Sequence, residues 1–113
     1  MKLNIKKHPR EFKPSKVHDI VIKDYGTILL EKNEQVTFIT KGKKEYDLVK
    51  KEWGFYATPS VNDRLKKEGF KTAYVKNKNG QRYIMLVDIN KSKVFMKYLN
   101  DTKQTIIKWL DES

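Results

Sequence analysis

The clearest signal for the fold is the stretch Thr72–Asp88, which reads TAYVKNKNGQRYIMLVD. Asn79-Gly80 stands there between two runs that are rich in β-forming residues. This dipeptide suits a two-residue type I′ turn, because both central positions of that turn need positive φ. The stretch therefore predicts an antiparallel hairpin, whose register follows by counting outward from the turn. The expected pairs are Lys78 with Gln81, Lys76 with Tyr83, Val75 with Ile84, Tyr74 with Met85 and Ala73 with Leu86.

This register sorts the hairpin side chains onto two faces, since successive side chains of a strand point to opposite sides. The face assigned to the core carries Ala73, Val75, Ile84 and Leu86. The other face carries Tyr74, Lys76, Tyr83 and Met85. That second face serves either as a contact surface or as a packing face, with Tyr74 and Tyr83 paired under the C-terminal helices.

Shorter β-like runs precede the hairpin, and a helical pattern follows it. The runs cover 17–23, 27–31, 35–40 and 45–50, and turn signals such as Asp24-Tyr25-Gly26 separate them. Residues 91–99 have helical spacing with Asn90 as N-cap, whereas 102–110 suit either a second short helix or a terminal strand. The expected fold is α+β: a small antiparallel sheet of about five to six strands with one or two short C-terminal helices.

The length of 113 residues leaves room for one domain. We expect a basic N-terminal arm over 1–16, which contains Pro9 and Pro14, and a single α+β domain over 17–113. No apolar run reaches the roughly 20 residues that cross a bilayer, so no transmembrane segment is expected. The chain has no cysteine, which fits a reducing compartment and a cytoplasmic location.

The formal net charge of +11 is concentrated in two segments. Residues 1–16 and residues 64–78 each carry six basic side chains and one carboxylate. Such clusters favour an anionic partner. Only Arg10, Arg64 and Arg82 are arginines, however, and a lysine surplus of this kind also arises from an AT-rich coding bias. Solvated surface therefore stands beside binding as an explanation of the charge.

Our leading hypothesis places a ligand site on the 53–64 loop, which reads WGFYATPSVNDR. Aromatic residues that anchor a loop let it present polar groups at little entropic cost. The candidate ligand-binding residues are Tyr56, Thr58, Ser60, Asn62 and Arg64. The expected partner is a phosphorylated sugar, a polyanion or an acidic protein surface. In the structural alternative, Trp53, Phe55 and Tyr56 fill the core, and Asn62 or Asp63 caps a helix over 64–68 that ends at Gly69.

The main alternative function is nucleic-acid binding by the arm, the 64–78 lysine cluster and exposed hairpin tyrosines. Lysines would neutralise phosphates, and aromatic rings would stack on unpaired bases. The candidate residues are Lys6, Lys7, Arg10, Lys66, Lys67, Lys71, Tyr74, Lys76 and Tyr83. No RNP octapeptide, GxxG loop or zinc-finger ligand set accompanies them. A second alternative is an inhibitor or adaptor that covers an anionic groove of another protein.

Signals for catalysis are weak. His8 and His18 are the only histidines, and neither lies at metal-ligand spacing from a second ligand. No nucleophile elbow, P-loop or dinucleotide fingerprint occurs. Glu45 and Asp47 lie two residues apart among lysines, which is typical of solvated neighbours rather than of an acid/base pair. We therefore predict no cofactor and no metal, and a non-enzymatic role is more consistent with the sequence.

Four phrases of the chain resemble a group of small uncharacterised bacterial proteins that are associated with cell-surface polysaccharide gene regions. The phrases are KEYD (44–47), WGFYATPS (53–60), GFKTA (69–73) and YIMLV (83–87). The resemblance implies an accessory role near sugar or nucleotide-sugar metabolism. It carries no active-site residues over to this chain.

Overall fold

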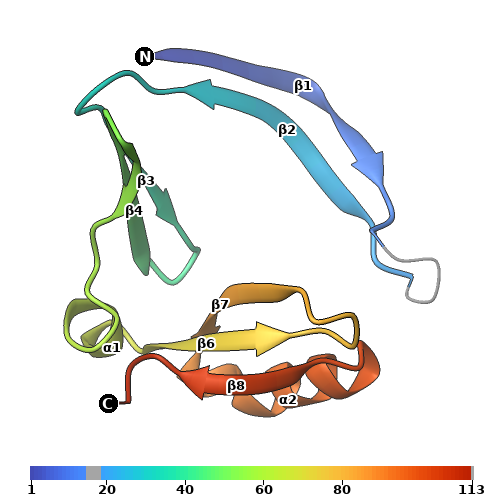
Figure 1. Ribbon diagram of the computed structural model, residues 1–113. Helices are drawn as coiled ribbons and strands as arrows, with labels where there is room; N and C mark the ends of the chain where they lie inside the picture. The colour runs from blue at the N-terminus through green and yellow to red at the C-terminus, as the bar shows by residue number, and fades with distance from the viewer. Residues whose placement is uncertain (15–18, 113) are drawn as a thin grey trace. The chain divides into compact units, whose positions relative to one another are not determined.

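The computed structural model describes residues 1–14 and 19–112. The described residues form mostly β-structure, in three small antiparallel sheets with strand orders β1-β2, β3-β4-β5 and β7-β6-β8 (Figure 1). The strands are β1 (Lys2–Phe12), β2 (Ile22–Leu29), β3 (Gln35–Ile39), β4 (Glu45–Lys51), β5 (Gly54–Ala57), β6 (Phe70–Lys76), β7 (Arg82–Asp88) and β8 (Thr105–Trp109). The helices are α1 (Arg64–Lys67), the 3₁₀ turn η1 (Ile89–Lys91) and α2 (Ser92–Asp101).

The α+β class is confirmed, but the expected strand count is wrong. Among the described residues, eight strands in three sheets replace the single sheet of five to six strands. The chain also divides into two compact units. The first unit comprises residues 1–36 and 49–56, and the second comprises 37–48 and 57–113. Each unit is described below by itself.

The first unit is built on the β1–β2 hairpin. The register runs from Lys2 opposite Leu29 to Phe12 opposite Ile22, with an irregularity between Ile5 and Arg10. Most of the sequence expected to form a basic arm is therefore a paired strand. The boundary of that arm at residue 16, and His18, lie outside the described residues.

A turn expected at Asp24-Tyr25-Gly26 is wrong, because these residues lie inside β2. Gly26 stands opposite Ile5 at a φ of +136°, and a Cβ on it would lie 1.9 Å from the carbonyl oxygen of Asn4. A glycine at this position marks a close approach of two backbones rather than a chain reversal. The Asp24 carboxylate accepts a hydrogen bond from the Gly26 amide at 3.1 Å.

The second unit contains all the buried side chains among the described residues. Its core lies between the β7-β6-β8 sheet and α2, and consists of Ala73, Val75, Val87 and Leu99. Met85, Phe95, Ile106 and Trp109 pack against this cluster. Phe95 and Trp109 meet at 6.1 Å between ring centroids. One face of the sheet is therefore covered by α2 (Figure 1).

The β6–β7 hairpin is confirmed, but its expected register is wrong by one residue. Val75 lies opposite Tyr83, Tyr74 opposite Ile84, and Lys76 opposite Arg82. The loop is longer than predicted, because the Asn77 amide donates to the Gln81 carbonyl and encloses three residues. The Asn77 side-chain oxygen accepts hydrogen bonds from the amides of Asn79 and Gln81, each at 3.0 Å. Only Gly80 has positive φ in this loop, which is the pattern of a type I turn followed by a bulge.

The one-residue difference in register exchanges the two expected faces of β7. Ala73 and Val75 are fully buried as predicted. Ile84, assigned to the core, is 56% exposed, whereas Met85 packs against the core in its place. A one-residue change of register moves each side chain of a strand to the opposite face.

The C-terminal segment consists of one helix and one strand. Residues 105–109 form β8, so the strand alternative for this stretch is correct. The helix forms as α2, but Asn90 is not its cap. Asp88 accepts a hydrogen bond from the Asn90 amide at 2.9 Å and so caps the preceding 3₁₀ turn.

Candidate functional site

Arg64, one of the candidate ligand-binding residues of the 53–64 loop, takes part in an internal network within the second unit. Its Nη2 donates to Oδ2 of Asp47 at 2.6 Å, and its Nη1 donates to the Thr58 hydroxyl at 3.2 Å. The Asp47 carboxylate also accepts the hydroxyls of Thr37 at 2.6 Å and Thr58 at 3.2 Å. This network joins β3, β4, the loop between β5 and α1, and α1 itself.

The electrostatics of the network favour both charged forms. The pKa of Asp47 is lowered, first by the hydrogen bond from Thr37 and then by that from Arg64. The pKa of Arg64 is raised, chiefly by its hydrogen bond to Asp47. Asp47 is only 7% exposed, so the expectation that it is a solvated neighbour of Glu45 is wrong. A buried carboxylate needs such partners, because leaving it unpaired would cost free energy.

The other loop candidates are spread over both units. Tyr56 belongs to the first unit, whereas Thr58, Ser60 and Asn62 belong to the second. The Ser60 hydroxyl accepts a hydrogen bond from the Arg64 amide at 2.8 Å and so holds the first turn of α1. Asn62 is exposed. Of the candidates in the second unit, Thr58, Ser60 and Arg64 are thus engaged in holding the chain together.

The structural alternative for the same loop is confirmed in part and wrong in part. A short helix, α1, does begin at Arg64, and Gly69 follows it with a φ of +89°. The side chain of the N-cap residue Asp63 accepts no capping hydrogen bond from a helix amide. The aromatics expected in the core are exposed instead, by 72% for Trp53, 63% for Phe55 and 49% for Tyr56.

The β7-β6-β8 sheet has a second face, opposite α2, which we call the open face. Directly paired residues share a face, so Tyr74 lies beside Ile84 and Lys108. Lys76 lies beside Arg82 in the same way. The open face is thus defined by Tyr74, Lys76, Arg82, Ile84 and Lys108. All of them except the half-buried Tyr74 are exposed.

Arg82 and Tyr74 form the best-defined contact of the open face. The Arg82 Nη1 donates to the Tyr74 hydroxyl at 3.2 Å, and the guanidinium carbon lies 5.9 Å from the ring centroid. A guanidinium held against an aromatic ring is a cation–π arrangement. The contact places the guanidinium of the edge strand β7 beside the ring of the central strand β6.

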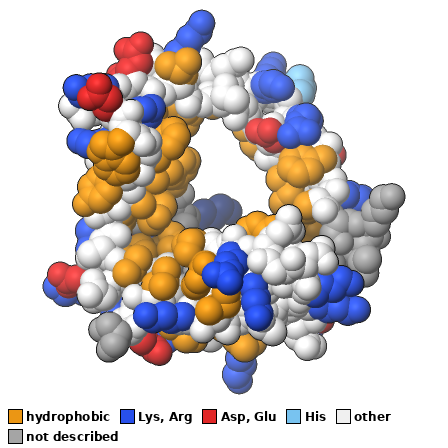
Figure 2. Space-filling model, viewed as in Figure 1, with side chains coloured by type: hydrophobic (Ala, Val, Ile, Leu, Met, Phe, Trp, Pro, Cys, Tyr) orange, Lys and Arg blue, Asp and Glu red, His pale blue; other side chains and the backbone are white. Residues whose placement is uncertain are grey.

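The open face is also free of negative charge along most of its length. Residues 69–87 and 102–110 contain no Asp or Glu, whereas Lys76, Arg82 and Lys108 lie on the open face itself. Asp88, at the end of β7, forms an ion pair with Lys44 at 3.1 Å. Figure 2 shows Lys and Arg side chains among hydrophobic ones on the surface over β6, β7 and β8. An anion is therefore attracted to this face.

The remaining nucleic-acid candidates vary in availability. Lys66 is exposed, whereas Lys67 pairs with Asp63 at 2.8 Å. Lys71 lies 4.5 Å above the Trp109 ring and pairs with Glu112 at 2.9 Å, and these contacts occupy it. Tyr83 is 44% exposed and lies on the face that α2 covers, opposite Val75. The expected pairing of Tyr74 with Tyr83 is therefore wrong.

The arm residues Lys6, Lys7 and Arg10 belong to the first unit. All three lie in β1, and Lys6 and Lys7 stand in the irregular part of the strand. Arg10 donates to Asp24 at 3.2 Å and stacks 4.6 Å from the Phe12 ring centroid. The two lysines are exposed.

No cluster of three or more potential metal ligands occurs among residues 1–14 and 19–112. Within the same residues, no helix is long and apolar enough to cross a membrane. Comparison with known protein family models, with curated proteins and with solved structures finds no match. The resemblance to polysaccharide-associated proteins stays a prediction.

Proposed function

We propose that the protein is a small binding module for an anionic polymer, and that this polymer is single-stranded nucleic acid bound on the open face. The observation that carries the proposal is the Tyr74–Arg82 contact, flanked by Lys76 and Lys108 on strands that lack carboxylates. No catalytic step is part of the proposal.

The chemistry of the open face fits an unpaired strand better than a duplex. The ring of Tyr74 offers a stacking platform, and base stacking on such a ring contributes about 1–3 kcal/mol per base. The exposed cations beside it can neutralise backbone phosphates. Binding of this type tolerates many sequences, because every base has a π face.

The 53–64 loop supports the proposal less well. Its guanidinium is paired with Asp47, so an incoming anion would have to compete with a carboxylate held at 2.6 Å. Recognition of a phosphorylated sugar by this loop, and an adaptor role, stay predictions. The sugar hypothesis requires Asn62, and the adaptor hypothesis requires a protein partner. Binding of nucleic acid to the open face requires neither.

The direct test is fluorescence anisotropy of labelled single-stranded DNA and RNA of about ten nucleotides at low salt, a length within the site sizes of such proteins. Tyr74→Leu should weaken binding at least fivefold, since about 1 kcal/mol of stacking is lost. Tyr74→Phe keeps the ring and should retain most of the affinity.

Two further variants serve as controls. Asn62→Ala changes an exposed candidate residue of the 53–64 loop and should leave binding unchanged. Lys93→Gln removes an exposed charge from α2, away from the open face, and should change binding less than Lys76→Gln does. Equal losses in Lys93→Gln and Lys76→Gln, or full binding by a folded Tyr74→Leu variant, would contradict the proposal.

A further inference from the structure

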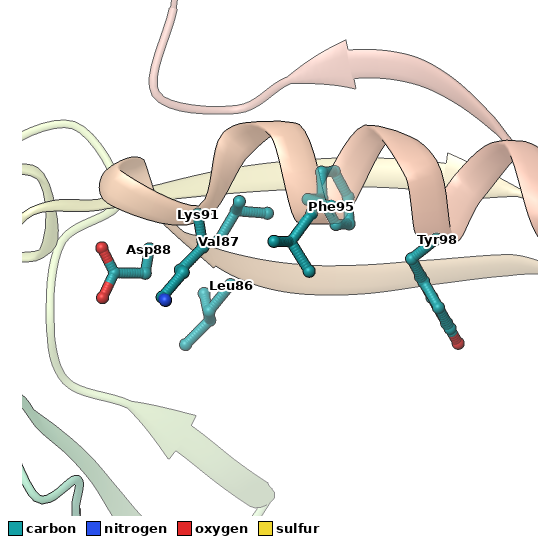
Figure 3. Close-up of a pocket in the computed structure, with 7 residues that line it drawn as sticks. Leu86, Val87, Asp88, Lys91, Phe95 and Tyr98 are labelled. Carbon is teal, nitrogen blue, oxygen red and sulfur yellow. The ribbon is translucent and has the colours of Figure 1, made fainter. Parts of the chain in front are cut away.

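A groove lies between β7 and α2 in the second unit. Its walls are apolar and include Leu86, Val87, Val94 and Phe95, and it is an open groove of about 290 Å³. Figure 3 shows Asp88 and Lys91 together at one end and Tyr98 at the other. Val94 is 65% exposed, so its apolar side chain is accessible to a ligand. The groove is therefore apolar along its length and polar at one end.

The charge at the polar end is positive. The Asp88 carboxylate already accepts the Asn90 amide at 2.9 Å and pairs with Lys44 at 3.1 Å, and its pKa is lowered mainly by these bonds. Lys91 has no carboxylate within 4.0 Å among the described residues. The N-terminus of α2 follows Lys91 directly and adds a partial positive charge.

We propose that this groove binds a small amphipathic carboxylate, with the aliphatic chain along Val94 and Phe95 and the carboxylate at Lys91. The dimensions agree with this ligand class. Lys91 and Tyr98 are seven positions apart, so the helical rise separates them by roughly 10 Å, the length of a chain of about eight carbons. The volume is at the small end of ligand pockets.

The groove includes none of the five residues that define the open face, and its chemistry differs from that of the open face. Apolar walls cannot neutralise phosphates, so a nucleic acid does not fit here. An amphipathic cation is disfavoured, because Lys91 would repel it while Asp88 is already paired. A neutral alcohol of the same length would gain the apolar contacts and lose only the charge interaction.

The test is a titration of the full chain with sodium octanoate, followed by amide shifts in ¹H–¹⁵N correlation spectra. Saturable shifts are expected at Val87, Phe95 and Tyr98 and not at the open face. Hexanoate should bind about tenfold more weakly, since two methylene groups fewer are buried. Octanol should bind about threefold to fivefold more weakly, because an exposed ion pair contributes little.

Variants distinguish the contribution of the ion pair to octanoate binding from the contribution of the apolar contacts. Lys91→Gln should weaken octanoate by the same threefold to fivefold and leave octanol unchanged, whereas Lys93→Gln should alter neither. Val94→Asp places a carboxylate on an exposed wall position and should abolish octanoate binding without unfolding the chain. Absence of saturable shifts with octanoate, equal binding of octanoate and octylammonium, or no effect of Lys91→Gln would each overturn the proposal.

Discussion

Replacing Asp47 with asparagine tests whether the Asp47–Arg64 network stabilises the fold. The substitution keeps the shape of the side chain but removes its charge and one acceptor. Asp47 receives hydrogen bonds from Thr37, Thr58 and Arg64 at 2.6, 3.2 and 2.6 Å. A hydrogen bond to a charged group contributes about 1.5–3 kcal/mol, and bonds in one network do not add. We expect a loss of about 2 kcal/mol, which lowers Tm by roughly 10 °C in a domain of this size.

The stabilisation of the fold by Asp47 depends on pH, and the direction of this dependence follows from the lowered pKa of Asp47. The folded-state pKa of Asp47 lies below its ordinary value of 3.8, so the stabilisation is present above pH 3.8. It is lost as the pH falls through the lower folded-state pKa, where the carboxylate takes up a proton. The difference in Tm between wild type and Asp47→Asn should therefore be constant near neutral pH and shrink in acid.

Thermal unfolding followed by circular dichroism measures the loss in Tm caused by Asp47→Asn and the change of that loss with pH. The matched control is Asp63→Asn, the same chemical change in an ion pair whose side chains are 66% and 79% exposed. Exposed pairs contribute little, so the control should have nearly the wild-type Tm. Equal Tm values for Asp47→Asn and the control, or a difference that persists unchanged in acid, would refute the argument.

Two further substitutions test the backbone arguments. Gly26→Ala should disrupt the β1–β2 hairpin, because its Cβ would lie 1.9 Å from the Asn4 carbonyl oxygen, whereas Gly42→Ala meets only the Thr40 hydroxyl at 3.8 Å and should be tolerated. Hydrogen exchange should then show β1 amides losing protection while β6 amides keep theirs; protected β1 amides in Gly26→Ala would contradict this. Asn77→Ala removes the acceptor of two turn amides and should cost about 1 kcal/mol, or roughly 5 °C in Tm. An unchanged Tm would mean that the loop forms without that side chain.

The sequence predicts elements well where the signal is local. The β6–β7 hairpin, the helix after residue 90 and the burial of Ala73 and Val75 all follow from patterns within a few residues. The predicted register was wrong because the loop is one residue longer than a two-residue turn. The Asn77 side chain stabilises this longer loop by accepting hydrogen bonds from two loop amides. The Asn79-Gly80 dipeptide by itself does not indicate these hydrogen bonds.

The candidate site was harder to predict, because its contacts are distant in sequence. Arg64 pairs with Asp47, 17 positions away, and nothing in the local pattern of either residue indicates that partner. Lys108 joins Tyr74 only because residues 105–109 form a strand beside β6. The correct register of the hairpin would have predicted that Arg82 belongs to the open face, since it places Arg82 opposite Lys76.

The salt dependence of binding to a single-stranded oligonucleotide tests the central claim most directly. Each phosphate contact on a single strand contributes about −0.7 to the slope of log K against log salt. If Lys76 and Arg82 both contact phosphates, the double variant Lys76→Gln, Arg82→Gln should have a slope that is shallower by about 1.4 than that of the wild type. A slope equal to that of the wild type in the folded double variant would show that the open face does not hold the strand.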